Sequence, residues 1–211
     1  MPNVTEMYGD TLKKTRWTDG QNYYLSNWYG MDPDPVNGFI LRYDIMCELV
    51  GKDRADSDEP FTTIDNNIGV VSMGVQQISS LKCENFVGRS SAVTMPEAVK
   101  IMQPRRVIIG FGTNNLTMDV DTFIEEYKEG LAAIHEAYPY ADIIVNAIPP
   151  LDKQRENTNL TMTQVDAYNA ALVKMCEENG FKFLNSSEVL RDSATGWART
   201  DYTLSDGVHL S

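Results

Sequence analysis

Short apolar runs alternate with longer amphipathic stretches along the chain from residue 68 onward. Four runs, 68–73, 106–112, 142–148 and 182–185, are almost continuously apolar. A strand that is buried on one face alternates apolar and polar residues, whereas strands of parallel sheets are covered on both faces and lose that alternation. These runs therefore predict the strands of a parallel sheet.

The stretches between the runs carry the signals of helices. Residues 94–103 and 161–179 each open with a threonine three positions before Glu97 or Gln164, which is the capping-box pattern. Residues 119–138 place apolar side chains at intervals of three and four, the spacing of an amphipathic helix. Strands that alternate with helices through right-handed crossovers predict an α/β fold, with three α/β/α layers and a mostly parallel sheet of about five strands.

The first part of the chain shows neither helical nor strand periodicity. Residues 1–38 are rich in aromatic side chains and in turn formers such as Thr18-Asp19-Gly20. We therefore expect an N-terminal extension or lid there, ahead of a main domain at 39–211. Residues 38–51 fit a short strand running into a helical turn, or a helix throughout. The acidic residues in 52–67 predict a solvated loop.

Charge and composition narrow the classes of function. The chain carries 30 acidic and 18 basic residues, for a formal net charge of −12, and 42% of its residues are hydrophobic. Nucleic acids and anionic membranes demand a concentrated positive face, so neither is an expected partner. No apolar run approaches the roughly 20 residues of a membrane-spanning helix. We expect a globular domain without a transmembrane segment, and the sequence leaves compartment and oligomeric state open.

The three cysteines lack the short spacing of metal sites. Cys83 and Cys176 have no neighbouring His or Cys and are expected to be small buried hydrophobes. Of the two histidines, His135 lies in the last turn of a predicted helix, where it complements the helix dipole. We expect no metal or organic cofactor.

Three features fall at the carboxyl ends of predicted strands, where open parallel sheets bind their ligands. Gly74 follows the first run, Gly112 and Asn114 follow the second, and Asp206 and His209 lie in the loop after the last. A neutral imidazole can take a proton from a nucleophile, a carboxylate three residues earlier can orient it, and N–H groups can bind an oxyanion. The set predicts an acyl-transfer site.

In these residues the C-terminal two thirds of the chain resemble the SGNH hydrolases, also called the GDSL lipases and esterases. That family carries a serine nucleophile in G-D-S-L, a glycine donor, an asparagine donor in G-x-N-D, and a terminal D-x-x-H. The matching residues are Gly74, Gly112 and Asn114 (with Asn115 replacing the usual Asp), and Asp206 with His209. The resemblance implies a flavodoxin-like fold and cleavage of a small-molecule or carbohydrate ester, such as an acetyl or small acyl ester. It implies His209 as general base, Asp206 as its orienting partner, and Gly74 and Asn114 as oxyanion donors.

The serine of the first block has no plain counterpart. Gly9-Asp10-Thr11-Leu12 is close to G-D-S-L, but the segment before it is a poor strand. Phe39-Ile40-Leu41 is a better strand, yet only Tyr43 follows it with a hydroxyl. The alternatives are Thr11, a serine such as Ser72 or Ser79, or a residue outside this sequence. Without a nucleophile, the alternative function is a catalytically inactive domain that binds carbohydrate or protein.

Overall fold

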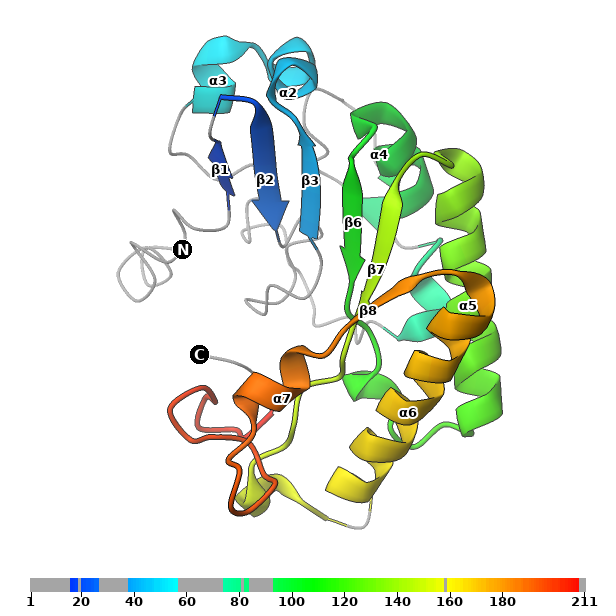
Figure 1. Cartoon of the computed structure of the whole chain (residues 1–211), viewed down its shortest axis with the longest axis vertical. Helices are drawn as coiled ribbons and strands as arrows, with labels where there is room; N and C mark the ends of the chain where they lie inside the picture. Colours follow the sequence, from blue (N-terminus) through cyan, green and yellow to red (C-terminus); the bar gives the residue numbers. More distant parts are fainter. Residues whose placement is uncertain are drawn as a thin grey trace.

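The computed structural model describes residues 16–18, 20–26, 38–56, 74–80, 82–83, 93–157 and 159–208. Six described strands form one sheet in the order β1-β2-β3-β6-β7-β8, and β4 pairs with β5 separately (Figure 1). The strands are β1 (Arg16–Thr18), β2 (Asn22–Ser26), β3 (Gly38–Arg42), β4 (Lys82–Cys83), β5 (Val93–Thr94), β6 (Arg106–Ile109), β7 (Asp142–Asn146) and β8 (Lys182–Leu184).

The C-terminal half of the sheet has the predicted parallel arrangement. β6 pairs with β7 and β7 with β8, both in parallel. The helices are α4 (Met95–Met102), α5 (Val120–Ala137) and α6 (Met162–Asn179), which lie together on one side of β6 and β7 (Figure 1). The capping boxes predicted at Thr94 and Thr161 are present. The predicted α/β fold is confirmed, and the short α7 (Ser186–Leu190) after β8 adds a helix that the sequence pattern does not predict.

The N-terminal half of the sheet is antiparallel, which the sequence pattern also does not predict. β1 pairs with β2, β2 with β3, and β3 with β6, each time antiparallel. For residues 38–51 the first alternative is confirmed, because β3 runs into α2 (Tyr43–Val50). The loop predicted from residue 52 is wrong at its start, where α3 (Lys52–Asp56) forms with an ion pair between its first and last residues. The predicted strand 68–73 lies outside the described residues.

Burial alternates along β6 and β7 although most of their residues are apolar. The fully buried positions are Val107, Ile109, Ile143 and Val145, which join one core with side chains of α4, α5 and α6. The positions between them, such as Ile108 and Ile144, are half-buried. The helical layer therefore buries one face of these strands more completely than the other.

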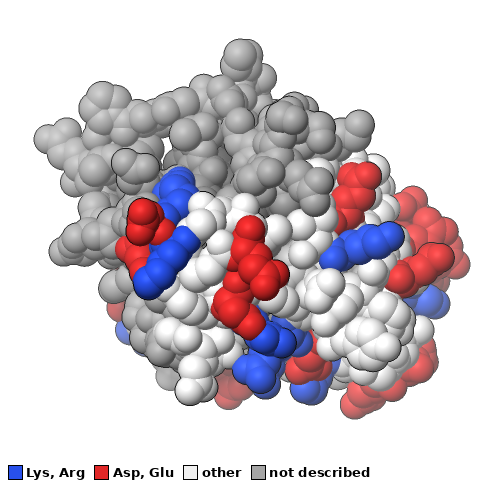
Figure 2. Space-filling model, turned by 90° about the horizontal axis from the view of Figure 1, so that it is seen from above, with Lys and Arg blue, Asp and Glu red and all other residues white. Residues whose placement is uncertain are grey.

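Charges of both signs share the surface. Ion pairs include Arg42 with Asp44, Lys52 with Asp56, and Lys182 with Asp142. In Figure 2 the blue and red side chains lie beside one another and do not gather into a basic patch on that face. Within the part of the chain that the structure describes, no helix is long and apolar enough to cross a bilayer.

Candidate active site

The loop after β6 tightens into a 3-10 turn, η4 (Thr113–Asn115), that carries Asn114. Gly112 enters this turn with a φ of +136°, a conformation that residues with a side chain rarely adopt. A Cβ atom at Gly112 would lie 2.4 Å from Cδ1 of Ile148. The turn closes with the Asn115 N–H donating to the Gly112 carbonyl at 2.8 Å. Asn114 is consequently exposed at the carboxyl end of β6.

Gly112→Ala is expected to lower the free energy of unfolding by about 2 to 4 kcal/mol, because steric overlap with Ile148 adds to the unfavourable φ. Urea unfolding followed by circular dichroism measures this change. Gly180→Ala is the matched control: Gly180 has a φ of +73°, but a Cβ there meets nothing within 4 Å. Only the φ cost of about 1 kcal/mol is expected for the control. Equal losses in the two variants would contradict the close packing at Gly112.

Asn115, the neighbour of Asn114, joins two segments that are 40 residues apart. It is only 5% exposed. Its Oδ1 accepts the Val75 N–H at 3.0 Å, and its Nδ2 donates to Oε1 of Gln76 at 3.3 Å. These bonds tie the turn after Gly74 to the turn that carries Asn114. Aspartate offers the same acceptor oxygen for the Val75 N–H, which accounts for asparagine standing where an aspartate is usual.

Gly74 is buried and precedes η3 (Val75–Gln77). Its N–H donates to Oε1 of Gln77 at 2.9 Å. The side chain of Gln76 covers its Cα, because a Cβ atom at Gly74 would lie 2.4 Å from Oε1 of Gln76. The N–H that the sequence predicts as an oxyanion donor therefore already has a neutral acceptor. Gln77 must turn away before this N–H can bind another oxygen.

Asp206 lies in a turn that packs against the loop after β7, next to η5 (Lys153–Arg155). The Asp152 N–H donates to the Gly207 carbonyl at 2.9 Å, and a Cβ at Gly207 would lie 2.9 Å from Cβ of Asp152. Oδ1 of Asp206 accepts the Val208 N–H at 2.9 Å. This C-terminal segment lies near the end of the sheet at which β6 and β7 finish (Figure 1). His209 lies outside the described residues.

Side chains of α6 hold the loops after β6 and β7. The bonds run from Gln164 Nε2 to the Leu116 carbonyl (2.9 Å), from the Tyr168 hydroxyl to the Asn115 carbonyl (2.8 Å), and between the amide of Asn169 and both backbone groups of Ile148 (2.8 and 3.0 Å). Burial raises the pKa of Tyr168, and the negative charge of Asp119 adds to this shift. The phenol therefore stays protonated and acts as a donor. The sequence pattern predicts a helix over 161–179 but gives Tyr168 no role of its own, so this contact was not predicted.

The residues considered as nucleophiles fall in different places. Thr11 and Ser72 lie outside the described residues, and Ser79 is half-buried in the turn after η3. Tyr43 lies at the other end of the sheet, since β3 runs antiparallel to β6. Its hydroxyl donates to Asp56 at 2.7 Å and accepts from Lys52 at 3.0 Å. The residues that follow β3 therefore lie away from Asn114.

The remaining candidate groups are the cysteines and the side chains that could bind a metal. Cys176 is 2% exposed, as predicted, and burial raises the pKa of its thiol to about 11, so the thiol is protonated at neutral pH. The side chain of Cys83 lies outside the described part. Among the described residues, no group of three or more His, Cys, Asp or Glu side chains could hold a metal ion.

A family model described as GDSL-like Lipase/Acylhydrolase matches residues 71–211, about two thirds of the chain. The match includes the Gly74, Asn114 and Asp206 turns. The chain belongs to the GDSL-like lipase/acylhydrolase family. Membership in the GDSL family confirms the resemblance inferred from the sequence motifs. No curated protein matches the chain.

Several solved structures are similar to this GDSL family member. A GDSL-like lipase from Bacteroides thetaiotaomicron VPI-5482 is 18% identical, with a TM-score of 0.47, over 56% of this chain and 59% of that one. A lipase/acylhydrolase from Enterococcus faecalis is 19% identical, with a TM-score of 0.45, over 56% of this chain and 58% of that one. A carbohydrate esterase family 3 protein from Talaromyces cellulolyticus is 19% identical, with a TM-score of 0.46, over 66% of this chain and 59% of that one. The chain thus spans just under three fifths of the length of each of these proteins.

Proposed function

We propose that this chain is an esterase that removes an acetyl or other small acyl group from a carbohydrate or a similarly polar alcohol. The observation that carries the proposal is the 3.0 Å hydrogen bond from the Val75 N–H to Asn115, which ties the Gly74 turn to the Asn114 turn. The Asp206 turn packs on the loop that follows the next strand. Hydrogen-bond donors and a carboxylate on adjoining loops support acyl transfer.

In the proposed reaction, His209 takes the proton of a hydroxyl nucleophile as its oxygen attacks the ester carbonyl carbon. The Asn114 amide and the Gly74 N–H bind the oxyanion that forms. Asp206 fixes the tautomer of the imidazole and stabilises the imidazolium. His209 then gives the proton to the departing alcohol as the C–O bond breaks. A water molecule, deprotonated by His209, attacks the acyl-enzyme, and the nucleophile regains its proton as the acid leaves.

Reaction with a fluorophosphonate tests the proposal together with hydrolysis of p-nitrophenyl acetate. We expect a covalent mass increase on the intact protein, and peptide mapping names the nucleophile among Thr11, Ser72 and Ser79. His209→Ala should label far more slowly, because the nucleophile then lacks its base. A folded sample of this chain that neither labels nor hydrolyses the ester would contradict an esterase complete within these 211 residues.

Gln77→Ala tests whether the Gly74 N–H takes part. Removing the amide that competes for this N–H is expected to raise kcat/KM for p-nitrophenyl acetate by about two- to tenfold, the value of one hydrogen bond. Gln76→Ala is the comparison: it leaves the bond between Gly74 and Gln77 intact but removes the acceptor of Asn115 Nδ2, so kcat/KM should not rise. A fall in kcat/KM for Gln77→Ala would show instead that Gln77 keeps the turn in its working shape.

A non-catalytic domain of the same family that binds carbohydrate or protein is the second candidate. The direction of β3 favours this candidate. β3 pairs with β6 in the antiparallel direction, so the residues that follow β3 lie away from Asn114. In the family that the sequence resembles, the nucleophile directly follows a strand. Binding of a carbohydrate by a folded chain that a fluorophosphonate does not label would support this candidate.

A further inference from the structure

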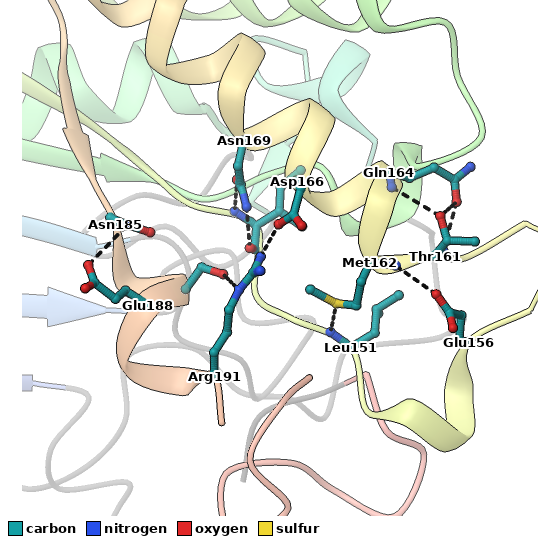
Figure 3. Close-up of polar contacts among 12 residues, drawn as sticks. Leu151, Glu156, Thr161, Met162, Gln164, Asp166, Asn169, Asn185, Glu188 and Arg191 are labelled. Carbon is teal, nitrogen blue, oxygen red and sulfur yellow. Dashed lines mark hydrogen bonds and ion pairs between the residues drawn. The ribbon is translucent and has the colours of Figure 1, made fainter. Parts of the chain in front are cut away.

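A hollow lies between α6 and the segment that runs from β8 into α7. Its volume is about 330 Å³, within the range of small-molecule sites. Figure 3 shows several of its polar side chains, with Asp166 and Asn169 coming from α6 and Asn185, Glu188 and Arg191 from the facing segment. None of these residues has a role in the proposed ester chemistry.

Most of the accessible lining of the hollow is apolar. Ala170 and Val173 of α6 and Phe183 of β8 contribute to it. Val173 is 37% exposed and Phe183 is half-buried, so both remain accessible to a ligand. These three side chains offer an apolar surface against which one face of a small ring can pack.

Arg191 is the cation among the described residues of the lining, and its guanidinium group is held by two contacts. Nη2 of Arg191 lies 2.5 Å from Oδ1 of Asp166 (Figure 3). Nε of Arg191 donates to Oγ of Ser187 at 3.2 Å. Ser187 is 2% exposed, so this contact lies deep in the wall. Glu188 adds a second carboxylate to the same lining. Two carboxylates around one paired guanidinium disfavour an anionic ligand.

Acceptor oxygens dominate the polar part of the lining. The side-chain oxygen and nitrogen of Asn169 are both hydrogen-bonded to the backbone of Ile148. The Asn185 amide donates to Oε2 of Glu188 at 3.4 Å. The carboxylates of Asp166 and Glu188 have room for several hydrogen bonds each, because an ionised carboxylate accepts at two oxygens. A ligand suited to this lining therefore brings several donors and an apolar face, and a sugar ring has both.

We propose that this hollow binds a neutral sugar ring, whose hydroxyl groups donate to Asp166 and Glu188 while its apolar face packs on Phe183 and Val173. The site is distinct from the ester-cleaving site but is linked to it. Asn169 lines the hollow and holds Ile148, and Ile148 packs against Gly112 at the start of the Asn114 turn. The hollow would therefore hold a sugar unit beside the loops of the candidate active site.

Titration of ¹⁵N-labelled protein with methyl β-glucopyranoside and with N-acetylglucosamine tests this proposal without any turnover. We expect saturable shifts of the Asn169 and Asn185 side-chain amides. Ala170→Phe places a ring in the hollow from an exposed helical position and should abolish these shifts. Ala132→Phe makes the same change at an exposed position of α5 that does not line the hollow and should keep them. Glu188→Ala should weaken binding about three- to tenfold, the value of one hydrogen bond.

The absence of saturable shifts with both sugars would overturn the proposal. Equal loss of binding in Ala170→Phe and Ala132→Phe would show that the sugar does not bind in this hollow. Saturable shifts with n-propylammonium chloride but with neither sugar would overturn the assignment of a neutral ligand and identify a cation site. Because binding is measured directly, a chain that fails the fluorophosphonate test can still give any of these results.

Discussion

Asp206→Asn is expected to lower kcat for p-nitrophenyl acetate about 10⁴-fold in a protein that stays folded. Asparagine keeps the oxygen that accepts the Val208 N–H, so the turn should keep its shape. In the proposed mechanism, the change removes the carboxylate charge that would hold His209 in the productive tautomer and stabilise the imidazolium. The equivalent change in a serine protease costs a similar factor. Initial rates at saturating ester, with circular dichroism as the check on folding, measure the effect.

Asp201→Asn is the matched control for this prediction. Asp201 lies on the same C-terminal segment and pairs with Arg199 at 2.7 Å on the surface. Removing its charge should leave turnover almost unchanged, because exposed ion pairs contribute little. If Asp206→Asn behaved like Asp201→Asn, Asp206 would be only a turn-forming residue.

Asn114→Ala is expected to lower kcat about 10²- to 10³-fold, the usual loss when one oxyanion donor is removed. Because Asn114 is exposed and Asn115 is buried, the loss of unfolding free energy should be smaller than for Asn115→Ala. The same ester assay and urea unfolding together measure both quantities. Unchanged turnover would remove Asn114 from the proposed oxyanion site.

The neighbouring residue provides the contrast to Asn114. Asn115→Ala leaves the Val75 N–H without its buried acceptor, and should cost about 1 to 3 kcal/mol of unfolding free energy. Asn115→Asp keeps an acceptor oxygen and should recover part of that loss. The two adjacent asparagines are thus expected to differ in effect: Asn114→Ala should lower mainly turnover, and Asn115→Ala should lower mainly stability.

Local patterns were sufficient to predict most of the C-terminal half of the fold. The caps at Thr94 and Thr161 and the apolar spacing of 119–138 are written within a few residues of the helices they specify. β6 and β7 lie in almost continuously apolar runs, which are local signals of the same kind. The short α7 was missed, because five residues carry too little periodicity to identify a helix.

The antiparallel N-terminal strands could not be predicted in this way. β1 and β2 have no sustained alternation, and their order depends on pairing with β3 and, through it, with β6. Strand direction is not encoded in a short apolar run. Only the fold therefore shows that Tyr43 lies at the end of the sheet away from Asn114.

The sequence by itself determined the α/β class, the family, and the residue types of the candidate site, because capping boxes, apolar periods and short motifs are local in the chain. Tertiary structure decided which of these residues meet. The bond from Val75 to Asn115, the Gln77 oxygen on the Gly74 N–H, and the packing of Ile148 on Gly112 are visible only in the folded chain. Hydrogen bonds and close contacts depend on distances of a few ångströms between atoms, and the bond that joins the Gly74 and Asn114 turns spans 40 residues of sequence.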